Sequence, residues 1–495
     1  MRKRLLCLIL ALLLPCAALA DYTMAGYDDS STNRDWNTNL FFRRMEEKTG
    51  VHFTYRQYTK AAEWQKAKAG MQPGDADLPD VLFKADLRDE ECIQLLDSGV
   101  LIDLKPYISQ YCPNLYALMQ NNPEIEEAIT LPDGRIAALP SVCEQPVQNC
   151  VWLNREWLNA LGLQMPATAD ELTEVLRAFK QRDPNRNGKS DEIPLAFLGA
   201  FDLKFLGHAF GLTANDYNVR EVDGQAQFVP LQPAFRPFVE WLRALFSEGL
   251  LDPQGFVTSD SLRLVQKDTE TKRYGGMITT LPTTFLPSSW AGDYAVLPPM
   301  QYEGETVYRS FIGPVIRGTF AVTSACKDVA AVLSWVDQFY TEEVYILSSV
   351  GAENVDYVID GDGTWRMTSA TQNNSFFSAE ALLSSGSSYP CYASEEFQRR
   401  YHDHTVAQLS DEIETVCAVA RRPFPYFTLT EEQSARIAPL QSAIGRLVDE
   451  SIGRWVTGET AISDESFAAF EQQLKDAGLD EFMAFWQNIL EERNK

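Results

Sequence analysis

Strand and helix patterns alternate along most of this chain of 495 residues, and the alternation limits the folds open to it. Residues 51–58 alternate polar and apolar side chains with the period of a strand, directly after an amphipathic helix predicted over 39–49. Helices predicted over 61–69 and 90–98 flank a short buried strand at 78–83. Repeated strand–helix units of this kind predict an α/β fold with mainly parallel strands.

A second unit begins at Trp152. Thr168 is the predicted N-cap of a helix over 169–181, with Glu171 placed as its capping-box partner. Further helices are predicted over 235–248, 327–340, 431–453 and 464–477, and further strands over 275–280 and 320–323. The length allows two or three domains, so these units are expected to form more than one hydrophobic core.

The first twenty residues are typical of a secretory signal peptide. Residues 2–4 are basic, residues 5–14 form an apolar stretch too short to span a bilayer, and residues 18–20 form a small-residue cleavage site. The chain is therefore expected to be secreted, with residues 1–20 removed. Cys16 leaves a second route open, in which a lipid on this cysteine holds the protein at the extracellular face of the cytoplasmic membrane.

The net charge and the cysteine content limit which binding partners and which cellular compartment fit this chain. The formal net charge is −26, which disfavours nucleic acid and anionic membranes as binding partners. Seven of the nine cysteines follow the signal peptide, and none forms a Cys-x-x-Cys motif. Cys143 and Cys150 are near enough in sequence to close a loop, so buried free thiols and a disulfide both remain open.

Residues 183–194, Asp-Pro-Asn-Arg-Asn-Gly-Lys-Ser-Asp-Glu-Ile-Pro, place oxygen donors at alternate positions around a glycine turn. The spacing follows the first half of an EF-hand loop, but Pro194 stands where the EF-hand has its bidentate glutamate. We predict a shorter, structural calcium loop, with a solvated loop of Asx-turns as the alternative. The predicted ligands are Asp183, Asn185, Asn187, the backbone carbonyl of Lys189, Asp191 and Glu192.

Residues 152–166 (Trp-Leu-Asn-Arg-Glu-Trp-Leu-Asn-Ala-Leu-Gly-Leu-Gln-Met-Pro), 183–194 and 350–357 resemble segments of the extracellular solute-binding proteins of ABC transporters. The resemblance is to the family 1, oligosaccharide-binding type of Gram-positive bacteria, whose relatives include alginate-binding proteins with a calcium loop. It implies a two-lobe, periplasmic-binding-protein-like (type II) α/β fold with a hinge and an interlobe ligand cleft. The lobes it implies are an N-lobe of 21–140 and 308–350, and a C-lobe of 141–307 and 351–495 that carries the calcium loop.

The same resemblance implies a function in import rather than catalysis. An oligosaccharide would bind between the lobes, the lobes would close around it, and a pair of ABC permease subunits would recognise the closed form. The implied protein is a monomer with structural calcium. It does not bind nucleic acid.

Sugars have apolar faces and hydroxyl rims, so aromatic rings and carboxylates are the side chains expected at the cleft. Trp36 and Asp35 lie just before the helix predicted over 39–49, on the segment that links this helix to the first strand of the chain, and the carboxyl end of that strand is expected to face the ligand crevice. The candidate ligand contacts are Trp36, Asp35, Trp290, Trp365, Asp80 and Arg317. Core packing is the alternative for each tryptophan, a cap at the strand start for Asp80, and a surface charge for Arg317.

Other function classes remain as alternatives. A secreted carbohydrate-active enzyme needs only a pair of carboxylates across a cleft, and this chain has many acidic residues. The sequence contains no Gly-x-Ser-x-Gly or His-Glu-x-x-His motif, which disfavours the common hydrolases. A sugar-sensing or adhesion protein of the cell surface would share the fold, and a peptide ligand is also possible.

Overall fold

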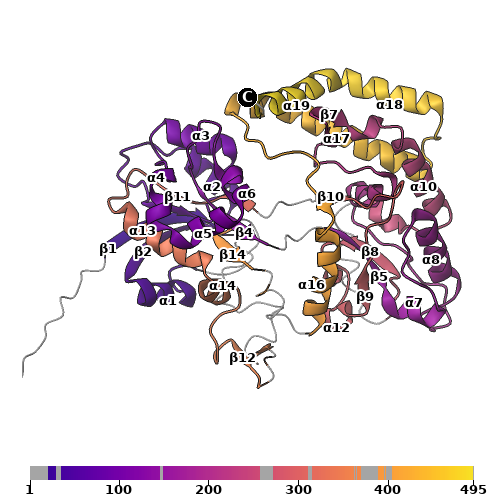
Figure 1. Cartoon of the computed structure of the whole chain (residues 1–495), viewed down its shortest axis with the longest axis horizontal. Coiled ribbons are helices and arrows are strands. Elements are labelled where there is room, and N and C mark those ends of the chain that lie inside the picture. The colour runs from indigo at the N-terminus through magenta and orange to yellow at the C-terminus, as the bar shows by residue number, and fades with distance from the viewer. Residues whose placement is uncertain are drawn as a thin grey trace, which may run out of the picture.

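The computed structural model describes residues 20–28, 35–144, 149–256, 271–309, 315–361, 363, 365–368, 388–394, 396 and 404–493. They form two lobes, the first on the left and the second on the right of Figure 1. Residues 1–19, with nearly all of the predicted signal peptide and Cys16, lie outside the described residues.

The first lobe is assembled from two stretches of sequence. The elements before the first crossing are β1 (Ala20–Tyr27), α1 (Leu40–Thr49), β2 (Val51–Tyr58), α2 (Ala61–Ala69), β3 (Val81–Phe83), α3 (Asp89–Asp97), α4 (Lys105–Tyr111), α5 (Pro113–Asn121), α6 (Pro123–Ile129) and β4 (Leu139–Cys143). The later elements are β11 (Val315–Val322), α13 (Val329–Asp337), η6 (Gln338–Tyr340), α14 (Glu342–Ser349), β12 (Tyr357–Ile359), β13 (Trp365–Met367) and β14 (Cys391–Ala393).

The first lobe is built on a six-stranded sheet in the order β14-β4-β11-β3-β1-β2. β1, β2 and β3 are parallel to one another, and β14 is parallel to β4. β11 alone runs antiparallel, against both β3 and β4. The mainly parallel arrangement predicted from the strand–helix alternation is therefore present in this sheet.

Helices cover both faces of the first sheet because its strands are apolar on both sides. Val81 and Phe83 of β3 pack on the face that α1, α4, α5 and α13 cover. Leu82, between them, packs on the opposite face with Trp64 of α2 and Leu95 of α3. Side chains alternate along a strand, so a strand that is apolar at every position needs a layer on each side.

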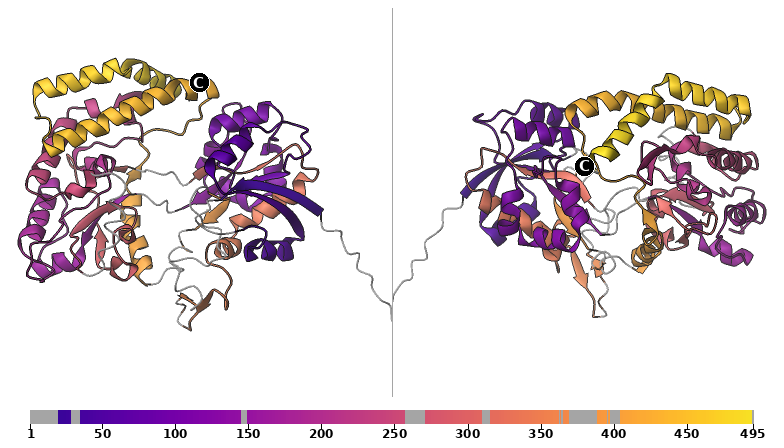
Figure 2. Two further views of the ribbon diagram at one scale, coloured as in Figure 1. Left: turned by 180° about the vertical axis from the view of Figure 1, so that it is seen from behind. Right: turned by 45° about the horizontal axis from the view of Figure 1, so that its top comes forward.

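The second lobe holds a larger core and most of the helices. Its elements are β5 (Cys150–Asn154), α7 (Arg155–Leu161), α8 (Ala169–Gln181), α9 (Ala200–Leu203), η2 (Lys204–Phe210), β6 (Val219–Val222), β7 (Gln225–Phe228), η3 (Val229–Leu231), α10 (Phe235–Ser247), η4 (Pro253–Phe256), β8 (Gly276–Thr279), η5 (Pro282–Thr284), α12 (Ser288–Ala291), β9 (Tyr294–Val296), β10 (Tyr308–Arg309), α16 (His404–Cys417), β15 (Ala420–Arg421), α17 (Glu431–Thr457), α18 (Asp464–Asp476) and α19 (Leu479–Arg493). The C-terminal helices α17–α19 lie along one side of this lobe (Figures 1 and 2).

The sheet of the second lobe has the order β8-β5-β9, and both pairs are antiparallel. The prediction of mainly parallel strands is therefore wrong for this lobe. Cys150 at the start of β5 pairs with Thr279 at the end of β8, so β8 runs back toward the edge where β5 begins. The alternation of strands and helices in the sequence does not reveal strand direction, because pairing partners far apart in sequence decide it.

Two of the predicted lobe ranges are wrong at their ends. β14 falls in the range 351–495 predicted for the C-lobe, yet Cys391 pairs with Ser141 of β4 in the first sheet. β10 falls in the range 308–350 predicted for the N-lobe, yet it pairs with β15, and Tyr308 packs in the core of the second lobe. Each strand is too short for its own pattern to show which sheet it joins.

The chain passes between the lobes after β4, after β10 and after β14. A fourth segment, Arg422–Thr430, leads from β15 to α17 and touches the first lobe on the way (Figure 1). We call this segment the strap. Repeated crossings of this kind are typical of two lobes that move about a shared hinge.

Local signals account for several helix boundaries. The Thr168 hydroxyl accepts a hydrogen bond from the backbone N–H of Glu171 at 3.2 Å, as its predicted N-cap role requires. Thr430 caps α17 in the same way and forms a full capping box with Gln433. Among the described residues, Cys92, Cys112, Cys326 and Cys391 are free thiols, and no helix is both long and apolar enough to cross a membrane.

Candidate ligand-binding site between the lobes

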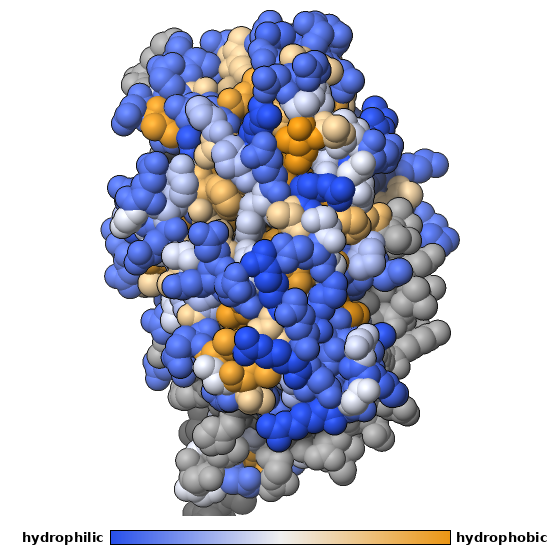
Figure 3. Space-filling view, turned by 90° about the vertical axis from the view of Figure 1, so that its right-hand side faces the viewer, coloured by the Kyte–Doolittle hydropathy of each residue, from blue (hydrophilic) through white to orange (hydrophobic). Residues whose placement is uncertain are grey.

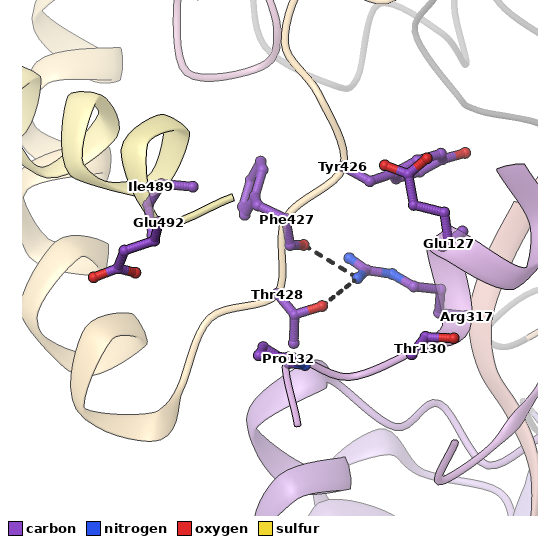
Figure 4. Close-up of a pocket in the computed structure, with 10 residues that line it drawn as sticks. Glu127, Thr130, Pro132, Arg317, Tyr426, Phe427, Thr428, Ile489 and Glu492 are labelled. Carbon is purple, nitrogen blue, oxygen red and sulfur yellow. Dashed lines mark hydrogen bonds between the residues drawn. The ribbon is translucent and has the colours of Figure 1, made fainter. Parts of the chain in front are cut away.

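A pocket of about 320 Å³ lies between the lobes, and side chains from both lobes line it. The first lobe supplies residues of α6 and the loop after it, together with Arg317 of β11; the second lobe supplies the strap and the end of α19 (Figure 4). The lining residues are Glu127, Ala128, Thr130, Pro132, Arg317, Tyr426, Phe427, Thr428, Ile489 and Glu492. The volume is at the lower end of the range for small-molecule sites, which is roughly 300–1,000 Å³.

Arg317 joins the two lobes at this pocket. Its Nη1 donates to the backbone carbonyl of Phe427 and to the hydroxyl of Thr428, both at 3.2 Å (Figure 4). The same nitrogen lies 2.9 Å from a carboxylate oxygen of Asp89 at the start of α3. One guanidinium group of the first lobe therefore holds the strap and is itself paired with a carboxylate of its own lobe.

Tyr426 presents an aromatic ring to the same pocket, and a second ion pair holds it in place. The guanidinium of Arg422 stacks 3.4 Å from the centre of this ring and also pairs with Glu124 of α6 at 3.2 Å. Burial raises the pKa of Tyr426, with Glu124 and Glu127 adding to the shift while Arg422 and Arg317 oppose it. The phenol is therefore neutral at physiological pH, and its buried hydroxyl has no hydrogen-bond partner in the described structure.

The chemistry of this pocket combines aromatic surface with hydrogen-bonding groups of both kinds. Tyr426 and Phe427 supply rings, Thr130 and Thr428 supply hydroxyls, and Glu127 supplies a carboxylate. Rings suit the apolar face of a sugar, and the polar groups suit its hydroxyl rim. The pocket can hold a small polyhydroxylated molecule.

The structure places Trp36 in the core, so the prediction that it contacts ligand is wrong. Its side chain is 1% exposed and packs against Phe42 and Phe83, with ring centres 5.7 Å away in each case. Its indole N–H donates to the buried carboxylate of Asp28 at 3.0 Å. Asp35 is exposed, and its carboxylate is used locally, accepting from the backbone and side-chain amides of Asn37.

The other predicted contacts are dispersed. Asp80 precedes β3 and accepts from the backbone and hydroxyl of Thr23, so it lies at the amino end of β3 rather than at the carboxyl edge. Trp290 is half-buried on α12, with Lys272 Nζ 5.5 Å from its ring, and Trp365 stacks on Tyr357 at 4.4 Å. Of the six residues predicted from the sequence, only Arg317 lines the interlobe pocket.

No residue of the strap was predicted from the sequence to contact the ligand. Its sequence, Arg-Pro-Phe-Pro-Tyr-Phe-Thr-Leu-Thr over 422–430, places three aromatic residues and two prolines in a segment with no helical or strand periodicity. Aromatic residues held in a proline-rich connection between elements are a signal for a binding loop. Glu127 and Glu492, by contrast, are ordinary helix-surface glutamates in sequence, and only the packing of α6 and α19 brings them to the pocket.

Comparison with known structures identifies the fold of this chain. No protein-family model matches this chain. The crystal structure of the Streptococcus pneumoniae ABC-transporter substrate-binding protein FusA in complex with kestose superposes with a TM-score of 0.73 at 24% identity, over 96% of this chain and 99% of that one. This chain has the two-lobe fold of the ABC-transporter substrate-binding proteins. The predicted fold class and the family resemblance are confirmed.

Two carbohydrate-binding proteins are similar to this chain in sequence. The fructooligosaccharide ABC transporter substrate-binding protein FusA of Streptococcus pneumoniae is 32% identical over 322 residues, which are 62% of this chain. The alignment spans 58% of FusA, little more than half of that protein's length. The polygalacturonan/rhamnogalacturonan-binding protein YtcQ of Bacillus subtilis is 23% identical over 68% of this chain and 69% of its own length.

Two further structures of the substrate-binding fold concern calcium. One is an EF-hand mutant of FusA in complex with fructo-nystose, with a TM-score of 0.73 at 23% identity over 96% of this chain and 99% of that one. The other is the alginate-binding protein AlgQ2 without calcium ion, with a TM-score of 0.66 at 19% identity over 95% of this chain and 98% of that one.

The predicted calcium loop follows α8 in the second lobe and folds around its own side-chain oxygens. Asp183 accepts from the backbone N–H groups of Asn187 and Gly188 at 3.1 and 3.0 Å. Asn185 accepts from Asn187 at 3.1 Å, and Asn187 accepts from Lys189 at 2.7 Å. Gly188 has φ 72°, which is the left-handed conformation predicted at the sharp turn.

The end of this loop contains a carboxylate in an unfavourable position. One oxygen of Glu192 is buried without a hydrogen-bond partner. Burial raises the pKa of Glu192, and the nearby carboxylates of Asp191 and Asp183 raise it further. Among the described residues, no group of three or more His, Cys, Asp and Glu side chains is arranged to hold a metal, so amide and carbonyl oxygens would have to complete a site. The donors present are all hard oxygens, the type that Ca²⁺ prefers.

Proposed function

We propose that this chain is the solute-binding component of an ABC importer and carries an oligosaccharide in the pocket between its lobes. The observation that carries this proposal is the pocket itself, which neither lobe forms alone. α6 and Arg317 of the first lobe face the strap and α19 of the second lobe across it (Figure 4). A ligand that touches both sides favours whichever lobe arrangement brings the two sides together.

Lobe closure follows from this arrangement. A ligand shifts the equilibrium between open and closed forms only by the difference in its affinity for the two forms. Contacts to Tyr426 and Phe427 from the second lobe add to those from α6 only when the lobes approach, so the closed form binds more tightly. The permease subunits would then recognise the closed form, and import, rather than sensing or adhesion, is the proposed outcome.

The proposal includes export from the cytoplasm and a monomeric state. Signal-like residues 1–20 support delivery to the extracellular face of the cytoplasmic membrane, either as a secreted protein or through a lipid on Cys16. The outer face of the second lobe in Figure 3 is mainly hydrophilic, with apolar residues in separate patches. Separate small patches are normal for a monomer and offer little surface for self-association.

A titration with oligosaccharides tests the function. We expect a bound oligosaccharide to raise the melting temperature by mass action and to reduce the radius of gyration in small-angle X-ray scattering as the lobes close. A ligand that raised the melting temperature without compaction would contradict closure. Chromatography of the sugar after incubation separates binding from catalysis, because a carbohydrate-active enzyme would release shortened products.

Calcium is part of the proposal as a structural ion in the loop 183–194. Asp183, Asn185, Asn187, Asp191, Glu192 and the carbonyl of Lys189 are the proposed ligands, and the ion would neutralise carboxylates that otherwise repel one another. We expect EDTA to lower the melting temperature and added Ca²⁺ to restore it, while Mg²⁺ restores it less. An unchanged melting temperature in EDTA would remove calcium from the proposal and leave sugar binding in place.

A further inference from the structure

The second lobe carries a further aromatic ring beside the interlobe pocket, that of Tyr217. This ring stacks on Trp486 of α19, with ring centres 5.2 Å apart and planes 23° apart. Trp486 is fully buried and lies one helical turn before Ile489, which lines the pocket (Figure 4). Phe427 of the strap also lines the pocket and meets the same tryptophan edge-on, with ring centres 4.8 Å apart. Tyr217 and Phe427 therefore share one support, and Tyr217 continues the aromatic wall beyond the pocket.

The backbone near Tyr217 is tied to the strap. Tyr217 lies two residues before β6, and in β6 the backbone N–H of Glu221 donates to the carbonyl of Pro423 in the strap at 2.7 Å. The side chain of Asn215 accepts from the backbone N–H of Tyr217 at 3.0 Å, which fixes the turn that carries the ring. The strap therefore helps to position Tyr217 and also supplies two rings of its own to the pocket.

Tyr217 also faces the first lobe. Burial raises the pKa of its phenol, and Asp216, the preceding residue, adds to the shift. Asp89 and Glu90 at the start of α3 raise it further, whereas Arg317 opposes it. These last three groups belong to the first lobe, so the phenol lies within electrostatic reach of the opposite wall of the pocket. The ring is half-buried, and its hydroxyl makes no hydrogen bond to any residue that the structure describes.

We infer that Tyr217 is a further ligand-contact residue and that the site extends along the strap to its ring, so that it holds an oligosaccharide longer than a disaccharide; this inference rests on the proposed function. The pocket itself is small, at about 320 Å³, so a chain of several sugar units must extend beyond it. A tyrosine ring suits the apolar face of the next sugar unit. Its hydroxyl can donate to or accept from that sugar's hydroxyl groups.

The test measures affinity against sugar length by isothermal titration calorimetry, with malto-, fructo-, xylo- and galacturono-oligosaccharides from the disaccharide to the pentasaccharide. We expect the wild-type protein to bind a longer sugar of at least one series at least tenfold more tightly than the disaccharide of that series. Tyr217→Ala should remove most of this preference by weakening the longer sugar alone. Tyr217→Phe, which keeps the ring, should retain most of it. If Tyr217→Ala does not fold, Tyr217→Leu keeps an apolar contact with Trp486 without a ring, and the same loss of preference is expected.

Tyr58→Ala is the matched control. It removes another half-buried tyrosine ring, 5.2 Å from the ring of the fully buried Trp64 in the first lobe and not on the lining of the interlobe pocket. It should leave the preference for length unchanged. Equal binding of all lengths by the wild-type protein, or equal weakening of short and long sugars by Tyr217→Ala, would overturn the inference and leave the proposed function intact. Absence of binding at every length would overturn the proposed function, and the inference with it.

Discussion

Arg317 in the first lobe donates a hydrogen bond to the backbone carbonyl of Phe427 in the strap of the second lobe, at 3.2 Å. These residues are 110 positions apart in the sequence. The contact joins two lobes that otherwise have separate hydrophobic cores, and it lies on the wall of the pocket between them. It therefore connects the position of the strap to the arrangement of the lobes.

Arg317→Gln is expected to weaken ligand binding at least tenfold while changing stability little. Arg317 is partly exposed, so loss of its pair with Asp89 costs at most about 1 kcal/mol. The strap, however, loses the group that fixes Phe427 and Thr428 against the pocket. Calorimetric titration and urea unfolding give the two quantities separately. Arg436→Gln, which breaks an exposed ion pair with Glu481, is the matched control and should leave affinity unchanged.

Trp36→Phe is expected to lower the free energy of unfolding by about 1–3 kcal/mol and to leave ligand affinity unchanged. The substitution removes the indole N–H that satisfies the buried carboxylate of Asp28, and an unsatisfied buried acceptor is costly. Urea unfolding measures the effect. Trp290→Phe is the comparison, because that ring is half-buried and its loss should cost less. A ligand-binding defect in Trp36→Phe with normal stability would contradict the core assignment.

Calcium stabilisation is expected to grow as the pH rises from about 4.5, the ordinary pKa of a glutamate, toward neutral pH. The pKa of Glu192 is raised by burial and by the carboxylates of Asp191 and Asp183. A carboxyl group whose folded pKa lies above its unfolded value contributes stability at low pH that is lost as the pH rises. The protein in EDTA therefore loses stability over this range, whereas bound Ca²⁺ favours the ionised form. Melting temperatures with Ca²⁺ and with EDTA should diverge toward neutral pH, and should diverge less in Glu192→Gln.

His208 is expected to make the protein less stable in acid. Burial lowers its pKa to about 4, and the Nε2 atom is buried without a partner, while the hydrogen bond between Nδ1 and the Phe205 carbonyl at 2.6 Å opposes the shift. A histidine whose folded pKa lies below its unfolded value contributes stability near neutral pH that is lost as the pH falls from about 6.5 toward about 4.

The loss of stability from this one group is about 3 kcal/mol, from the difference between the two pKa values. Urea unfolding at several pH values measures it. His208→Asn keeps a donor for the Phe205 carbonyl and removes the titrating ring, so its free energy of unfolding should depend less steeply on pH. An unchanged pH dependence would show that other groups govern acid unfolding.

Local features of the fold were accessible from the sequence. β2 covers the predicted strand 51–58, α2 covers 61–69, and α8 covers 169–181 with Thr168 as its cap. These elements follow from side-chain periodicity and capping, which depend on residues a few positions apart. The loop 183–194 was found for the same reason, since its oxygen donors and its glycine turn are adjacent in sequence.

The ligand site could be predicted only in small part. Tryptophans with polar neighbours in sequence were predicted to contact the ligand, and Trp36 has such neighbours although its ring lies in the core. Arg317 was predicted to contact the ligand, but nothing near it in sequence predicts its contact with Phe427. The pocket residues come from α6, β11, the strap and α19, so no local pattern contains them all.

The strand and helix segments, the calcium-type loop and the resemblance to a two-lobe binding protein can be predicted from the sequence, because each depends on residues that are close together in the chain. Tertiary structure decided which strands share a sheet, as when β14 joins the first lobe beside β4. It also decided which charges face the interlobe pocket. Hydrogen bonds and packing between segments hundreds of residues apart fix both, and these interactions leave no periodic trace in the sequence.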